Sequence, residues 1–140
     1  MGLVLEVLEK FVSTLDSDST VQTLLGGSGR VLLSEPEKAR VLPSIILRVI
    51  SDSPEKRLDA PIQFHLRISL RIFHTSWADA FALLDRVDAL FLHKPFSTAT
   101  FRIAACWREG AKPETSKDSL DAARVKGLSA EFVLRANKAA

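Results

Sequence analysis

The sequence predicts an α+β fold: a mostly antiparallel sheet of four to five strands with helices packed on one of its faces. Residues 62–72 alternate between apolar and polar side chains without a break, which is the period of a strand with one buried face. Residues 4–15 and 77–91 instead repeat their apolar side chains every three or four positions, as helices do. The 140 residues have the length of one domain, 1–140, and the expected order of elements is α-α-(β)-β-β-α-β-β.

The first predicted helix carries an apolar stripe at spacings of four, three and four residues. Its members are Val4, Leu8, Phe11 and Leu15, widened by Leu5 and Val12. Polar residues 16–19 end this helix, and Asp18 or Ser19 can cap a short second helix. Gly26 is the expected stop of the second helix, because glycine readily adopts the left-handed conformation that closes helices.

A third helix is expected to begin at Ser76, where Asp79 lies three residues on, as in a capping box. Lys94-Pro95 stops it. Its predicted apolar face consists of Trp77, Ala80, Phe81, Leu84, Val87 and Phe91. Asp85 and Asp88 lie one turn apart on the opposite face, where we expect them to be solvated.

The strands group into two predicted hairpins, over residues 44–74 and 98–136. Residues 30–33 form a further, short edge strand, which is the bracketed element of the order above. Between strands, residues 51–60 and 110–121 are charged or polar and are expected to be loops.

Two details of the second hairpin are also predicted. Its first strand alternates, with Thr100, Arg102 and Cys106 opposite an apolar side that consists of Ala99, Phe101, Ile103, Ala105 and Trp107. Its last strand, about 122–136, shifts its alternation next to Gly127, which predicts a β-bulge at that residue.

Composition excludes several classes of protein. The hydrophobic content of 46% and charged content of 26% are those of a globular protein rather than a disordered one. A net charge of +2 is too small to indicate nucleic-acid or membrane binding by itself, although the positive charge lies in the C-terminal half. The single cysteine excludes an intramolecular disulfide and a cysteine-rich metal site, which fits a chain made in a reducing cytoplasm.

No motif predicts catalysis, a cofactor or a metal. Cys106 is interpreted as a structural strand residue, and His65, His74 and His93 lack the spacing of metal ligands. The glycine-rich residues 26–30 lack both the preceding strand and the lysine of a phosphate-binding loop. We therefore expect neither enzymatic activity nor a cofactor.

Basic residues gather on the predicted polar face of the sheet or at its ends. They are Arg67, Arg71, Arg102, Arg108 and Arg135, with Glu131 among the few acids to balance them. The pattern is typical either of a solvated face or of a surface that meets phosphate or another subunit. Aromatic residues for base stacking are not expected on this face, which argues against an RRM-like module.

The whole chain resembles the small tail-terminator, or tail-completion, proteins of tailed bacteriophages and phage-like particles. The resemblance begins with a helical start that ends in LLGG, a short RVLL strand and the long alternating strand PIQFHLRISLRIF. A helix, SWADAFALLDRVDALF, follows at once, and the chain closes with SAEFVLRA. Within that helix the matching positions are Ala78, Ala80, Ala82, Leu84, Val87 and Leu90.

This resemblance implies an architectural protein of the virion, made in the bacterial host cytoplasm. It implies a six-membered ring that caps the head-proximal end of the tail tube, ends tube polymerisation and joins the tail to the head. The implied partners are other copies of the chain, the tail tube protein, a head-completion or neck protein and, in a contractile particle, the tail sheath. DNA would meet the ring only in transit through its lumen. A head-completion or head–tail joining protein and a nucleic-acid-binding module are the alternatives.

Two sets of charged residues are candidates for such contacts. The loop residues Asp52, Glu55, Lys56, Arg57, Asp59, Glu114 and Lys117 are predicted to set the register between copies and to become ordered on assembly. The residues Arg67, Arg71, Arg102, Arg108 and Lys112 are predicted to form a basic face or to line the lumen. Of these, Arg102 and Lys112, together with Lys117, are expected to touch DNA phosphates without regard to sequence.

Overall fold

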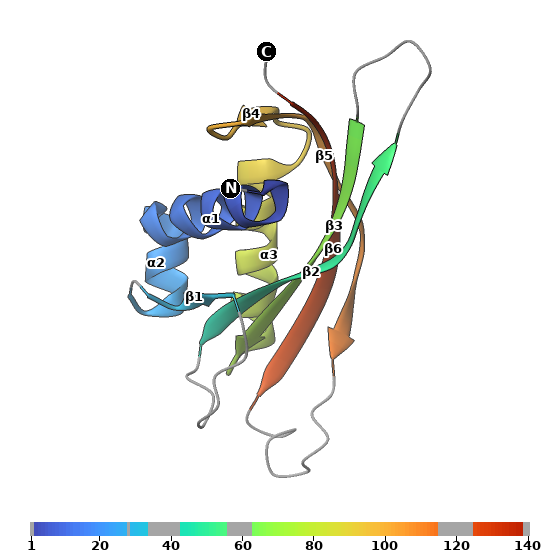
Figure 1. Ribbon diagram of the computed structural model, residues 1–140. Helices are drawn as coiled ribbons and strands as arrows, with labels where there is room; N and C mark the ends of the chain where they lie inside the picture. The colour runs from blue at the N-terminus through green and yellow to red at the C-terminus, as the bar shows by residue number, and fades with distance from the viewer. Residues whose placement is uncertain (1, 28, 34–42, 56–62, 115–124, 139–140) are drawn as a thin grey trace.

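The computed structural model describes residues 2–27, 29–33, 43–55, 63–114 and 125–138. Its helices are α1 (Leu3–Ser17), α2 (Ser19–Leu25) and α3 (Trp77–Phe91). Its strands are β1 (Val31–Leu32), β2 (Ser44–Glu55), β3 (Gln63–His74), β4 (Phe96–Ser97), β5 (Phe101–Glu114) and β6 (Lys126–Lys138). The α+β prediction is confirmed, and Figure 1 shows the three helices together on one side of a curled sheet.

The sheet has six strands in the order β1-β2-β3-β6-β5-β4. Both predicted hairpins are present, as β2 with β3 and β5 with β6, and β3 pairs with β6 to join them in the middle. All pairs are antiparallel except β1, which runs parallel to β2. The two-residue strand β4 is the element that the sequence pattern did not predict.

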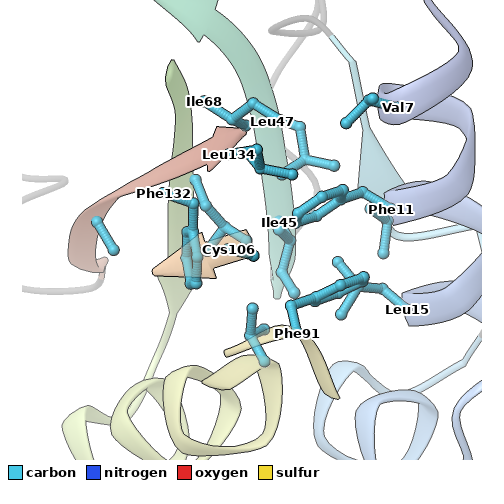
Figure 2. Close-up of a cluster of buried hydrophobic side chains, with 14 of the residues drawn as sticks. Val7, Phe11, Leu15, Ile45, Leu47, Ile68, Phe91, Cys106, Phe132 and Leu134 are labelled. Atoms are coloured by element: carbon cyan, nitrogen blue, oxygen red, sulfur yellow. The ribbon is translucent and has the colours of Figure 1, made fainter. Parts of the chain in front are cut away.

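The core lies between the helices and the sheet (Figure 2). Phe11 of α1 stacks on Phe91 of α3 with ring centroids 4.0 Å apart, and Phe132 of β6 meets Phe11 edge-on. The buried stripe of α1 is rotated slightly from the predicted one: Leu3 and Val7 are buried, whereas Val4 and Leu8 are half-buried. Leu5, expected to widen the stripe, is exposed.

Two strands continue into regions predicted to be loops. β2 extends through Ser51 to Glu55, and β5 extends through Gly110 to Glu114, because partners on β3 and β6 are available along this length. Each extension contains a proline, Pro54 in β2 and Pro113 in β5, and proline is compatible with a strand whose outer edge is unpaired. Within the described residues no strand pairs with that outer edge of either segment. The remainder of both predicted loops lies outside the described residues.

The predicted bulge at Gly127 is wrong, since Gly127 pairs in regular register with Phe73 of β3 and with Glu114 of β5. The register shifts occur instead between Val49 and Ser51 in β2, and twice in β5. The β5 shift between Ile103 and Ala105 reverses the alternation that follows. Cys106 therefore lies in the core and Trp107 on the opposite face, the reverse of the prediction.

Asp18 ties the two helical segments together. As predicted, it caps α2: its carboxylate accepts a hydrogen bond from the Val21 N–H at 3.1 Å. The same carboxylate accepts two hydrogen bonds from Arg86 of α3, from Nε at 3.0 Å and from Nη2 at 2.7 Å. Gly26 ends α2 in the left-handed conformation, also as predicted. The hydrogen bond from Arg86 lowers the pKa of Asp18, against the opposing effect of partial burial.

We expect Asp18→Ala to lower the free energy of unfolding by about 1–2 kcal/mol, the cost of a lost N-cap. Arg86→Met should cost less, because it removes the ion pair and leaves the cap in place. Since the pKa of Asp18 is lowered by folding, its contribution is complete above the unfolded pKa of about 4 and is lost as the pH falls through the folded value. Urea unfolding of the three proteins between pH 7 and pH 3 measures this. An Asp18→Ala penalty that stays constant over that range would contradict it.

Candidate functional site

The sheet face that points away from the helices is the main candidate surface, and we call it the open sheet face. This face exists because β3 and β6 pair in a register that places their core residues on the same side of the sheet. Their polar residues therefore lie together on the other side. Among the side chains that the structure describes, its charged members are Arg48, Arg67, Arg71, Arg102, Glu109, Lys112, Glu131 and Arg135. A shallow hollow on this face is lined by Glu109, Lys112, Ser129 and Glu131 together with the backbone at Gly110 and Ala111.

One arginine binds two acids of the open sheet face. Arg67 donates to both carboxylate oxygens of Glu109, with Nη2 at 3.1 Å from Oε1, and to Glu131 at 3.3 Å. Hydrogen bonding to Glu109 raises the pKa of Arg67. The described side chains of this face therefore carry more positive than negative charge.

Two further arginines lie beside aromatic rings. The guanidinium carbon of Arg71 is 4.9 Å from the centroid of Phe73, and that of Arg135 is 6.0 Å from the centroid of Trp107. The expectation of a face without aromatic residues is thus wrong, for Trp107 because of the register shift in β5. Phe73 is almost fully buried, so it supports Arg71 rather than offering a stacking surface.

Arg108 was predicted on the basic face and is not there. It lies on the helix side of the sheet, where its Nε donates to Asp88 of α3 at 3.0 Å. Both side chains are partly buried. Asp88, predicted to be solvated, is therefore an anchor between α3 and β5, whereas Asp85 is exposed as predicted.

The structure separates the other predicted site residues. Arg67, Arg71, Arg102 and Lys112, four of the five residues predicted for a basic face or the lumen, lie on the open sheet face. Arg102 lies at the opposite end of this face from Arg71 and Lys112, and Lys112 reaches the face because β5 is longer than expected. Asp52 and Glu55 belong to β2 and Glu114 to β5, rather than to loops. Lys56, Arg57, Asp59 and Lys117 lie outside the described residues.

Arg48, Glu109 and Trp107 are surface members that the sequence analysis did not assign. Arg48 pairs with Ser69 of β3, which lies on the open sheet face. The alternation of side chains along the strand could therefore have predicted its position. Glu109 and Trp107 come after register shifts in β5. A register shift exchanges the faces to which the following side chains point, so simple alternation along the sequence does not predict their positions.

The exposed side of α3 is a second candidate surface. Trp77 and Phe81, predicted to be in the core, are 38% and 47% exposed, because Leu83 takes the buried position instead. Their rings lie 6.1 Å apart. We call the exposed residues of this helix the α3 strip: Trp77, Ala78, Phe81, Ala82, Asp85 and Ala89.

Titratable groups in the described part of the chain show no catalytic arrangement. Cys106 is completely buried, and burial, reinforced by the charge of Asp88, raises the pKa of its thiol to about 12. His74 is held between backbone groups, with Nε2 2.9 Å from the Leu24 carbonyl oxygen and Nδ1 accepting from the Thr75 N–H. The described residues include no group of three or more His, Cys, Asp or Glu side chains that could hold a metal. None of their helices has the length and apolar character needed to cross a membrane.

Comparisons with known proteins give a shared fold. No family model matches the chain, and no curated protein sequence matches it. A chain from the virion of a native gene transfer agent particle has the same fold, with a TM-score of 0.75 and 13% identity over 97% of this chain and 98% of that one. A second solved chain, whose name states no function, aligns over 99% of this chain and 94% of its own with a TM-score of 0.57 and 8% identity.

The burial of Cys106 predicts its reactivity. In the native protein at pH 8 the thiol should react with a disulfide reagent at least about a hundredfold more slowly than in denaturant, because it is both inaccessible and protonated. Spectroscopic titration of the thiol with and without guanidinium chloride measures this ratio. Rapid labelling of the folded protein would show that the Cys106 thiol is accessible and would contradict its interpretation as a structural strand residue.

Proposed function

We propose that this chain is a structural virion protein that forms a six-membered ring at the head-proximal end of a phage-type tail. In this role it caps the tail tube, ends tube polymerisation and joins the tail to the head, with no chemical turnover. The observation that carries the proposal is the near full-length similarity in fold to a chain of a gene transfer agent virion. The resemblance of the sequence to tail-terminator proteins, which rests on the order of elements and on the closing strand SAEFVLRA, also supports it.

The surfaces of the molecule suit such a role. A head-to-tail ring needs two different patches on each subunit, since every copy meets one neighbour on each side. The open sheet face and the α3 strip are two such patches, one basic and one largely apolar. The tail tube protein and a head-completion or neck protein are the expected partners above and below the ring, with the sheath as a third in a contractile tail.

The basic open sheet face also favours a second candidate, a nucleic-acid-binding module. Such a module should bind duplex or single-stranded DNA as an isolated chain, with an affinity that falls steeply with salt. Fluorescence anisotropy at 50 mM and 200 mM salt distinguishes the two functions. The ring protein should show little binding at either concentration, because its contact with DNA is limited to transit.

Disruption of the gene tests the proposed function. We expect electron microscopy to show filled heads beside unattached tail tubes of abnormal length, because tube growth continues when the cap is missing. Expression of the intact chain in trans should restore normal tails.

Other phenotypes of the disruption would exclude the terminator role. Leaking heads beside tails of normal length would identify a head-completion or head–tail joining protein instead. Normal, infectious particles would contradict a virion role and would favour the nucleic-acid-binding module.

A further inference from the structure

The α3 strip lacks the polar character that a solvent-facing helix surface normally has. Five of its six residues are apolar: Trp77, Phe81 and three alanines, with Asp85 as the single charge. The other long helix follows the usual pattern. On α1 the exposed positions are Leu5, Glu9, Lys10, Ser13 and Ser17, so that one apolar side chain stands among four polar ones.

Trp77 and Phe81 make this difference important. They are among the few large hydrophobic side chains left exposed in the described residues, and they stand together on one turn of α3. Aromatic side chains are enriched at the centres of protein interfaces, where they bury a large area at a small entropic cost. Alanines around them allow a partner to approach the helix closely.

Charge is distributed unequally between the two sides of the sheet. Among the side chains of the open sheet face that the structure describes, six are basic and two are acidic, and Arg67 binds both of these acids. The helical side lacks such a basic excess: segments 2–33 and 75–95, counted together with Arg108, contain seven acidic and five basic residues. The open sheet face is therefore the basic side of the molecule, and Asp85, the single charge of the α3 strip, has the opposite sign.

We propose that the α3 strip of one copy docks on the open sheet face of the next copy. In this contact the rings of Trp77 and Phe81 lie against arginine side chains, an arrangement that combines apolar burial with cation–π attraction. Asp85 pairs with one of the arginines of the sheet face. The inference rests on the proposed function, because it assigns the two patches by which a ring would close.

The second copy is the occupant because the chain carries both complementary surfaces. The α3 strip and the open sheet face lie on opposite sides of one sheet, so a single molecule cannot bring its own two patches together. A head-to-tail contact uses each patch once per copy and leaves neither exposed when the rotation closes. A strip-to-strip dimer would instead leave the positive face without a partner.

Photocrosslinking tests the contact directly. Phe81 is replaced by photoreactive benzoylphenylalanine in the full chain, and the crosslinked peptides are identified in particle-producing cells and in the concentrated purified protein. Copies labelled with heavy nitrogen are mixed with unlabelled copies to show that the link joins two chains. We expect links to peptides of β3, β5 or β6 of another copy. Leu5, which is 43% exposed on α1, is the matched control and should give no such link.

Charge exchange tests whether Asp85 pairs with an arginine of the open sheet face. Asp85→Arg should weaken self-association or crosslinking at least about tenfold, the loss expected when an interface residue near the centre is reversed. Asp85→Arg is then combined in turn with Arg48→Asp, Arg102→Asp and Arg135→Asp. The double variant that reverses the arginine facing Asp85 should restore the contact. Glu9→Arg changes the charge of the exposed side of α1 by the same amount and should have no effect. Circular dichroism is the control that each variant is folded.

Three results would overturn the docking proposal: links from position 81 to α3 of another copy, links only to a different virion protein, or no link between copies. Failure of all three charge exchanges to restore the contact would also overturn it. These results are separate from the proposed function, which depends on the presence of the chain in particles and on tail length. A chain that enters particles and controls tail length, but gives no 81-to-sheet link, would refute only the docking contact.

Discussion

The pairing of β3 with β6 is the constraint on which the rest of the molecule depends. These strands are in continuous register from Gln63 opposite Asn137 to His74 opposite Lys126. Because side chains alternate, a slip of one residue would turn Arg67 and Arg71 toward the helices and their apolar neighbours toward solvent. The same register thus creates the core and the basic open sheet face, and the flanking strands β2 and β5 extend both.

The helices complete this arrangement by covering only one side of the sheet. Phe11 and Phe91 stack where α1 and α3 meet above the strands, and Asp18 links the start of α2 to Arg86 of α3. Arg108 and Asp88 connect α3 to β5 in a similar way. These contacts set the rotation of α3 about its axis, and that rotation leaves Trp77 and Phe81 exposed. A surface proposed for assembly is therefore a direct consequence of how the core is packed.

An identity of 13% to a gene transfer agent virion chain, at nearly full coverage, fits a protein defined by pattern rather than by particular residues. Alternation, helix periodicity and caps can be kept while most side chains change, since cores tolerate hydrophobic substitution at constant volume. The contacts between copies in the proposed ring need only complementary patches. Such patches leave no motif in the sequence, which is why the resemblance rested on the order of elements.

The sequence by itself determined the helices, both hairpins and the polar face of β3, because each depends on local periodicity, and it narrowed the cap of α2 to Asp18 or Ser19. It did not determine the ends of β2 and β5, where pairing with a neighbouring strand overrides the loop-forming prolines and charges. Only the tertiary structure decided that Trp107 faces outward, that Arg108 faces Asp88 and that Trp77 and Phe81 are exposed. These outcomes depend on register shifts and on the rotation of a helix against a sheet, which arise from contacts between residues distant in the chain.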